Sequence, residues 1–348
     1  MEIREASEND NQGLIELTRL TPMKGVISLR IDRQPDFFRL IRRRGEGVLM
    51  VAVEKNKIIG CFSATKRSVI VKGNTETVYY LADFKVHPEY RGTTASIRLV
   101  KAIVDYLLKN AAELVFSTAS EGNVRVLPFF KGRAGIHEWY RAGKFDVCSI
   151  LPSHELPTDP CTILKGAPPG FSLPDYYQSY YKMHYSVAPV IREQDMAGTI
   201  NLVAVVNGEV VGAINLADIS SMKQTIVTGI PFWLQLATRF SKRFSDMFGW
   251  PVIPGIGEQV RMLNLRYWAF NTGHEAAFRA LIQSARNIAA TEKYHFLSVG
   301  VHQRDPLQKI FKSFRHLRFT ANGFIIIKDE AKIKTYTEGI LFEDFTIN

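Results

Sequence analysis

Two pairs of short segments recur in the same order along this chain of 348 residues, and this repetition constrains the fold more than any other feature. KNKIIG at 55–60 corresponds to NGEVVG at 207–212, a shift of 152 residues, and each segment lies within apolar runs that predict a hairpin. ELVFST at 113–118 corresponds to HFLSVG at 295–300, a shift of 182 residues. Similarity that keeps its order along a chain indicates duplication of one unit. We therefore predict a tandem fold, with chance similarity between hairpins as the alternative.

A cluster of prolines between residues 151 and 175 marks the predicted boundary between the copies. Such a density excludes a regular helix or a central strand and favours an extended connection over the surface. We predict a first domain over 1–150, a linker over 151–175 and a second domain over 176–348. The second shift is larger than the first, and an extra segment near 231–258 accounts for the difference. We therefore predict an insertion at this place in the second copy.

The composition sets limits on location and redox chemistry. No stretch reaches about 18 consecutive apolar residues, and the opening segment MEIREASEND has no apolar signal core. We therefore expect a cytoplasmic protein without a membrane partner. Cys61, Cys148 and Cys161 are odd in number and lack the CxxC spacing of metal sites. They are expected to be packed thiols, and no metal is predicted.

The formal charge of +10 and a pI near 9.4 favour anionic partners, among them acyl-CoA, RNA and DNA. The densest basic cluster consists of Arg39, Arg42, Arg43 and Arg44. A solvated basic face explains such a cluster equally well. Because no zinc-finger spacing or aromatic-rich RNA-binding motif accompanies these residues, nucleic-acid binding is only a secondary hypothesis.

The segment VHPEYRGTTAS at 86–96 says most about function. It joins a β-rich run, TVYYLADFKV at 77–86, to an apolar periodic helix, SIRLVKAIVDYLLKN at 96–110. A strand that turns tightly into a helix presents unpaired backbone N–H groups and the positive end of the helix dipole, and both suit a diphosphate. The alternative is an ordinary strand, turn and helix with a basic turn.

In this segment the chain resembles the GCN5-related N-acetyltransferase (GNAT) superfamily, whose pyrophosphate loop has Arg or Gln, two residues, Gly, one residue, then Gly or Ala. Arg91 and Gly92 match the start of this loop, and the usual lead-in is matched by Val86, Pro88 and Tyr90. The predicted order of elements over 1–150 is also the order of the superfamily. The resemblance implies an α+β fold of two tandem acetyltransferase-like domains, each with a central mixed, mostly antiparallel sheet flanked by helices.

The resemblance further implies an acyl-CoA site, with acetyl-CoA as the expected co-substrate. The residues expected to bind it are Phe84, Lys85, Val86, Arg91, Gly92, Thr93, Thr94, Ala95, Ser96, Asn123 and Phe130. The two later small positions of the loop fall on Thr94 and Ser96, which departs from the family pattern. A β-branched Thr restricts the approach of a phosphate to the backbone, whereas a hydroxyl can donate to its oxygens. Weaker binding and altered geometry are both open.

In this superfamily an amine attacks the acyl thioester directly, so the resemblance implies a group that removes the amine proton. Asp83, on the strand that leads to the loop, is the candidate base, with Glu121 and Glu138 in reserve. The alternative is that Asp83 is an exposed or hydrogen-bonded strand carboxylate. Its alternation with Phe84 means that one of the two side chains faces the cleft.

The family also uses a Tyr hydroxyl to protonate the departing thiolate, and this chain has Phe130 at that position. A phenyl ring cannot donate a proton. Three possibilities remain: another group such as Tyr140 substitutes, the thiolate leaves unprotonated, or the domain binds without turnover. Asn123 is suited to hydrogen-bond the CoA arm, although it can also cap a helix.

The second copy lacks the ligand loop. After the strand VRMLNLRYWAF the chain continues NTGHEAAFRALIQS, in which only Gly273 eases the turn. We therefore predict that the first domain binds acyl-CoA and transfers the acyl group to an unidentified amine, while the second domain has a structural or substrate-shaping role. A non-catalytic acyl-CoA sensor or adaptor is the alternative, and a nucleic-acid-binding module is the third hypothesis. An oligomer is possible, with the segment near 231–258 as one candidate contact.

Overall fold

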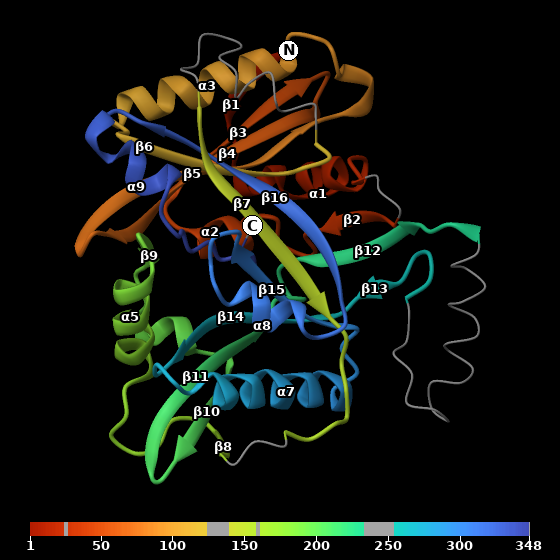
Figure 1. Cartoon of the computed structure of the whole chain (residues 1–348). Helices are drawn as coiled ribbons and strands as arrows, with labels where there is room; N and C mark the ends of the chain where they lie inside the picture. Colours follow the sequence, from red (N-terminus) through yellow and green to blue (C-terminus); the bar gives the residue numbers. More distant parts are fainter. Residues whose placement is uncertain (24–26, 124–138, 158–160, 233–253, 348) are drawn as a thin grey trace.

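The computed structural model describes residues 1–23, 27–123, 139–157, 161–232 and 254–347. Its main feature is a 13-stranded sheet that runs through the whole molecule (Figure 1). In spatial order the strands are β1 (Glu2–Glu5), β3 (Gly47–Glu54), β4 (Lys57–Val71), β5 (Asn74–Val86), β6 (Leu114–Ser120), β16 (His316–Ile327), β7 (Tyr140–Ile150), β15 (Phe296–His302), β14 (Met262–Phe270), β11 (Glu209–Asp218), β10 (Ile200–Val206) and β8 (Thr162–Lys165), and β9 (Val187–Pro189) pairs with β4.

The sheet is mixed but mostly antiparallel. Among its described strands only β5 with β6 and β14 with β15 pair in parallel. The helices are α1 (Asn11–Arg19), α2 (Phe38–Arg44), α3 (Ala95–Lys109), α5 (Leu173–His184), α7 (Glu275–Thr291), α8 (Gln308–Lys312) and α9 (Ile333–Thr337). The predicted α+β fold with a mostly antiparallel sheet flanked by helices is therefore confirmed.

The same succession of elements occurs twice. A hairpin (β3 and β4, or β10 and β11) is followed by a third strand (β5 or β14), a long helix (α3 or α7) and a parallel strand (β6 or β15). The helix α3 buries Leu99, Ile103 and Leu107, whose spacing of four residues gives one apolar face against the sheet. Figure 1 shows α3 along the upper part of the sheet and α7 along the lower part.

The two halves exchange their last strands, which the sequence did not predict. β16, near the end of the chain, lies between β6 and β7, with Ile326 opposite Val115 and Phe319 opposite Val147. β7, the last strand before residue 151, pairs on its other edge with β15. Because each final strand completes the sheet of the other half, the halves share one sheet.

The proline-rich segment contains some regular structure. β8 lies within 151–175 and forms an edge of the sheet, where proline-rich sequence is tolerated. The helix α5 also begins there, with Pro174 in its first turn, a position that lacks an intrahelical N–H partner in any case. The domain limits expected from the sequence stay predictions.

A second, small sheet ties the halves together. It contains β13 (Gln259–Val260), β12 (Gln224–Gly229) and β2 (Ser28–Asp32), with Thr225 of β12 opposite Ile31 of β2. Residues 233–253, most of the predicted insertion, lie outside the described residues.

Candidate active site

The strands β5 and β6 form a fork. They pair only over Tyr79–Leu81, opposite Val115–Ser117, and then continue without pairing to each other. At the same level the register between β4 and β5 shifts, so that Asp83 and Phe84 form a bulge. Asp83 has a positive φ of 55°, a conformation that Asp tolerates better than most residues. The bulge therefore turns the chain at the opening of what we call the first fork.

An apolar cavity of about 330 Å³ lies between this fork and α3, and we call it the α3 cavity. Its lining brings together three residues predicted from the sequence, namely Asp83, Phe84 and Asn123. The other lining residues are Phe62, Leu81, Ala82, Val100, Ile103, Val104, Leu107, Leu108, Ala112, Val115, Ser117, Thr118, Ala119, Trp139, Ile326 and Lys328. One of these lining residues, Leu108, is exposed.

The loop before α3 has the features of an anion site. Arg91, Gly92, Thr93 and Thr94 are all exposed, and Gly92 has a φ of 83°, where an added side chain would be strained. Thr94 precedes the helix but makes no capping hydrogen bond, and the first turn of α3 contains no acidic residue. The start of α3 therefore has neither a side-chain cap from Thr94 nor a carboxylate in its first turn, although the N–H of Arg98 donates to the carbonyl of Thr94.

Hydroxyl groups shape this loop. The hydroxyl of Thr93 donates to the carbonyl of Tyr90 over 2.7 Å and accepts from the N–H of Ala95 over 3.3 Å. Ala95 is buried against Leu99, and Ser96 is half-buried in the first turn. Val86 and Phe84 pack on the same cluster as Ala95, while Lys85 stands opposite Cys61 of β4.

Asp83 is held by two arginines. Arg33 Nη1 lies 3.0 Å from one carboxylate oxygen, Arg44 Nη1 pairs with the other, and all three side chains are buried. Burial by itself would raise the pKa of Asp83, but the charges of Arg44 and Arg33 outweigh it and hold the pKa below its ordinary range. Sequence reasoning missed Arg33, because a pairing between residues 50 positions apart depends on the fold.

A third cation, Lys223, belongs to the same cluster. It lies between β11 and β12 of the second half, and its N–H donates to the carbonyl of Ile219. Burial and the nearby charges of Arg44 and Arg33 together outweigh the charge of Asp83 and lower the pKa of Lys223 to about 8. Three cationic side chains from both halves therefore surround one carboxylate.

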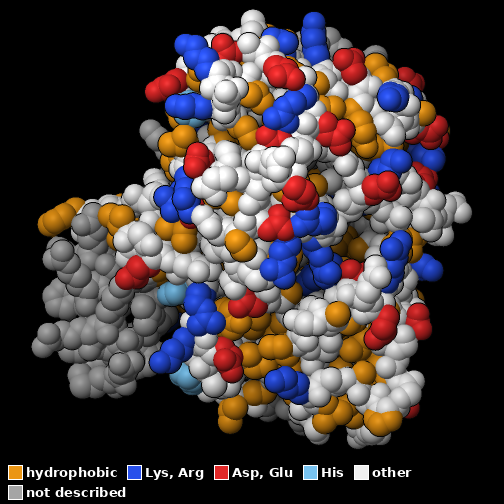
Figure 2. Space-filling view, turned by 180° about the vertical axis from the view of Figure 1, so that it is seen from behind, with side chains coloured by type: hydrophobic (Ala, Val, Ile, Leu, Met, Phe, Trp, Pro, Cys, Tyr) orange, Lys and Arg blue, Asp and Glu red, His pale blue; other side chains and the backbone are white. Residues whose placement is uncertain are grey.

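A larger cavity, of about 540 Å³, opens on the other face of the sheet, and we call it the central cavity. Its wall includes Tyr80 and Phe116, whereas Tyr79, Leu81 and Val115 belong to the core under α3. Seen from behind, Lys and Arg side chains gather across the middle of the molecule (Figure 2). The charged lining residues are Arg42, Arg43, Arg44, Glu46, Lys66, Arg67, Arg192, Asp195, Arg266, Glu343 and Asp344.

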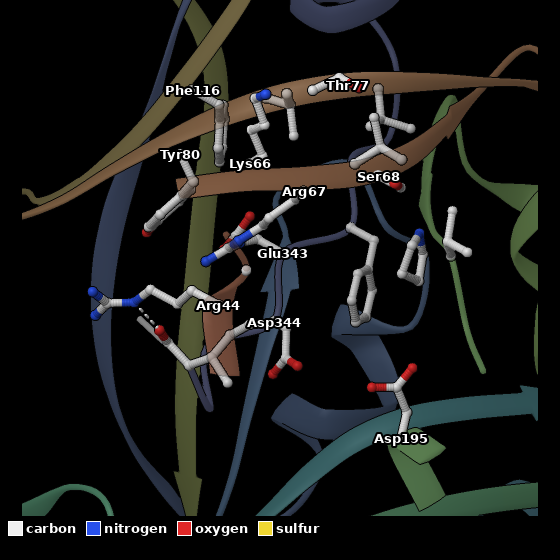
Figure 3. Close-up of a pocket in the computed structure, with 18 of the residues that line it drawn as sticks. Arg44, Lys66, Arg67, Ser68, Thr77, Tyr80, Phe116, Asp195, Glu343 and Asp344 are labelled. Atoms are coloured by element: carbon white, nitrogen blue, oxygen red, sulfur yellow. Dashed lines mark hydrogen bonds and ion pairs between the residues drawn. The ribbon is translucent and has the colours of Figure 1, made fainter. Parts of the chain in front are cut away.

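Ion pairs order the inner wall of the central cavity (Figure 3). Arg67 lies over the ring of Tyr80, 3.8 Å from its centre, and its Nη1 lies 2.9 Å from Glu343. Arg266 pairs with Asp344 over 2.7 Å and with Asp195 over 3.4 Å. Glu343 and Asp344 belong to the last residues of the chain, which have no motif, so sequence reasoning missed them.

Other predicted residues lie apart from this cluster. Tyr140 begins β7 opposite Ile325, is 42% exposed, and has no contact with Asp83 in the part of the chain that the structure describes. Glu121 is exposed and forms an ion pair with Lys144. Phe130 and Glu138 fall outside the described residues.

A second fork repeats the geometry of the first. β14 and β15 pair only over Met262–Asn264, opposite Phe296–Ser298. Here the space is filled by the end of the chain, because Phe345 packs so closely on Gly300 that an added Cβ would lie 2.2 Å from its ring. The remaining cavity is about 10 Å³. The second fork therefore has no room for a ligand.

Comparison with known proteins agrees with this geometry. Residues 14–135, the part of the chain that contains the first fork, match the model of the Acetyltransferase (GNAT) family. A comparison with curated proteins finds no match.

Solved structures show the same fold over nearly the whole chain. N-myristoyltransferase from Saccharomyces cerevisiae with bound myristoyl-CoA is 12% identical, with 93% of this chain and 82% of that chain covered and a TM-score of 0.58. A GCN5-related N-acetyltransferase from Anabaena variabilis is 13% identical, with coverages of 94% and 72% and a TM-score of 0.52. The chain thus has the fold of these structures, which agrees with the predicted acetyltransferase-like α+β fold.

Within the described ranges no group of three or more His, Cys, Asp or Glu side chains is arranged to hold a metal ion. None of the helices in those ranges combines the length and the apolar character needed to span a membrane.

Proposed function

We propose that the protein is an acyl-CoA-dependent N-acyltransferase whose single CoA site lies in the first half. One observation carries this proposal: the first fork lies beside an apolar cavity and a helix start that has no acidic residue and no cap from Thr94, whereas the second fork is filled. The N–H groups of α3 and Arg91 would bind the pyrophosphate. Asn123 and the bulge at Phe84 would bind the arm that carries the thioester.

The size of the α3 cavity indicates how long an acyl chain it can hold. A cavity of about 150 Å³ suffices for benzene, so about 330 Å³ has room for roughly twice as many carbons. An acetyl group would leave most of it empty. Acetyl-CoA remains the first ligand to test, and we propose that longer, unbranched acyl chains bind more tightly because each buried methylene adds up to about 0.8 kcal/mol.

The amine would reach the thioester from the central cavity. Its nitrogen attacks the carbonyl carbon, a C–N bond forms, the C–S bond breaks, and the electron pair leaves on the thiolate of CoA. The amine loses one proton, which is returned to the thiolate directly or through solvent. Attack from the face opposite to CoA keeps the two substrates from competing for space.

The role of Asp83 has two versions. The sequence predicts a base, but a carboxylate bound by two guanidinium groups is a weak proton acceptor. The ion pairs favour a positioning role, in which Asp83 fixes Arg33 and Arg44 at the bulge. If the variant Asp83→Asn keeps the full rate at every pH, Asp83 is not the base.

A calorimetric titration tests the CoA site. We expect one site per chain for acetyl-CoA, tighter binding of octanoyl-CoA, and a loss of at least tenfold in affinity for Arg91→Ala, because a charge-assisted contact to phosphate is lost. Arg141→Ala is the matched control, since Arg141 is exposed and lines neither cavity. Absence of binding for every acyl-CoA would overturn the proposal.

Turnover distinguishes the enzyme from a sensor. The transferase requires release of CoA that depends on an added amine, measured with a thiol reagent across a panel of amines. The sensor hypothesis draws support from the engaged state of Asp83 and from Phe130 at the usual Tyr position. Binding of acyl-CoA with no release of CoA for any amine would favour the sensor.

A further inference from the structure

The charges of the central cavity do not balance. Seven basic and four acidic side chains line it. Of the acidic ones, Glu343 is neutralised by Arg67, and Asp344 and Asp195 share Arg266. The inner wall is therefore close to neutral, and the surplus of positive charge lies elsewhere.

Arg42 pairs with Glu8 and Asp36, Arg44 pairs with Asp83, and Lys66 lies over the ring of Tyr79. The remaining surplus is carried by two arginines at the rim, one from each half. Arg43 lies in the last turn of α2, and Arg192 precedes the short helix Glu193–Met196. Both side chains are exposed, and within the described ranges neither forms an ion pair. Glu46 lies on the same rim and opposes only one of the two charges.

The two arginines line the same cavity and come from different halves of the chain. Arg43 comes from the first half but lies close to β14 of the second half: burial raises the pKa of the Tyr267 hydroxyl, and the charge of Arg43 is among those that oppose the rise. Arg192 lies on the second half, three residues before Asp195, which Arg266 contacts. Both guanidinium groups can thus reach a ligand in the cavity mouth.

We propose that the acceptor carries an anionic group, a carboxylate or a phosphate, in addition to its amine, and that Arg43 and Arg192 bind this group. This inference rests on the proposed function. Guanidinium groups bind such oxyanions in a bidentate manner, and convergent like charges are relieved when an anion lies between them. The amine would then point inward, toward Tyr80 and Glu343.

The experiment compares pairs of amines in which one member carries an anionic group and the other does not. Glycylglycine and glycylglycinamide test a carboxylate, while O-phosphoethanolamine and ethanolamine test a phosphate. Binding is measured by NMR saturation transfer in the presence of excess free CoA, which occupies the α3 loop and prevents turnover. CoA release is then measured with acyl-CoA in place of CoA.

We expect the anionic member of at least one pair to bind at least tenfold more tightly than the neutral member. The double variant Arg43→Gln, Arg192→Gln should abolish this preference. Arg315→Gln, which removes an exposed charge that lines neither cavity, should retain it. Melting curves of the three proteins verify that the variants are folded, and each single Arg→Gln variant should lose part of the preference.

The inference is overturned if neutral and anionic probes bind equally, if neither binds, or if the preference survives in the double variant. The two proposals fail separately. A preference for anions without CoA release would contradict the proposed transferase activity but would still support the anion site. CoA release with equal use of both probes would contradict the anion site alone.

Discussion

The two forks occupy the same position in the repeated unit but carry opposite charges. Asp83 and Arg266 each lie two residues beyond the last residue that pairs with the neighbouring parallel strand. In the first fork a carboxylate is held by the two cations Arg33 and Arg44, and in the second a guanidinium is held by Asp344 and Asp195. A buried ion cluster at the fork is thus a property of the unit, while an open cavity belongs to one copy only.

The starts of the long helices α3 and α7 also differ between the two copies. α3 follows an exposed loop with Arg91, and its first turn has no acidic residue. α7 follows His274 and has Glu275 in its first turn, where a carboxylate already satisfies the positive end of the helix. The second copy therefore differs from the first at both the phosphate end and the thioester end of the expected CoA site.

The largest predicted effect comes from breaking either ion cluster. Asp83→Asn leaves two buried guanidinium groups unpaired, and Arg266→Met leaves two carboxylates without their cation. Each change should lower the free energy of unfolding by about 3–5 kcal/mol. Chemical denaturation measures this loss, and calorimetry should show that Arg266→Met keeps the affinity for acyl-CoA. A weaker affinity in Arg266→Met would show that the second fork contributes to the site.

The next effect concerns the open cavity. Ala119→Phe should fill part of the α3 cavity, whose wall includes Ala119. Octanoyl-CoA should then bind about tenfold to a hundredfold more weakly, while free CoA binds as before, because only the acyl chain loses its space. Equal losses for free CoA and octanoyl-CoA in calorimetry would place the acyl chain elsewhere.

A smaller effect is the pH dependence that Lys223 confers. Burial lowers the pKa of this residue to about 8, so between about pH 8 and the ordinary lysine pKa the unfolded chain binds more protons than the folded one. Stability must therefore rise with pH in this window. We expect wild type to gain about 1–2 kcal/mol relative to Lys223→Met between pH 8 and 9.5, measured by urea unfolding. Parallel curves for the two proteins would contradict the lowered pKa.

The sequence predicted the repeated unit because hairpins and amphipathic helices leave local patterns. The turns at Lys55–Lys57 and Asn207–Gly208 and the apolar faces of α3 and α7 are of this kind. The exchange of β7 and β16 left no such pattern, since a strand of given composition pairs equally well with either neighbour. The fold class could be predicted from local sequence patterns, whereas the sheet that the two halves share depends on pairing between strands that lie far apart in the chain.

The candidate site divides in the same way. The loop around Arg91 and the position of Asp83 beside the fork followed from a motif that is continuous in the chain. The partners of Asp83 could not be found by spacing, because Arg33 and Lys223 come from different halves. The filled second fork was equally hidden, since Phe345 lies 45 residues beyond Gly300. Motifs predict which loop binds, and only packing decides which copy is open.

The smallest expected effect is the most specific test of the comparison. Glu275→Arg places a positive charge at the start of α7, as Arg91 does near the start of α3. The charge difference between the two helix starts is then removed, while the second fork stays filled. If an open fork is required, calorimetry with octanoyl-CoA should still give one site per chain, with an affinity within about twofold of wild type. The matched change Arg91→Glu in the first copy should abolish binding, because it places a carboxylate against the pyrophosphate. Two sites in Glu275→Arg would show that the helix start alone determines where CoA binds.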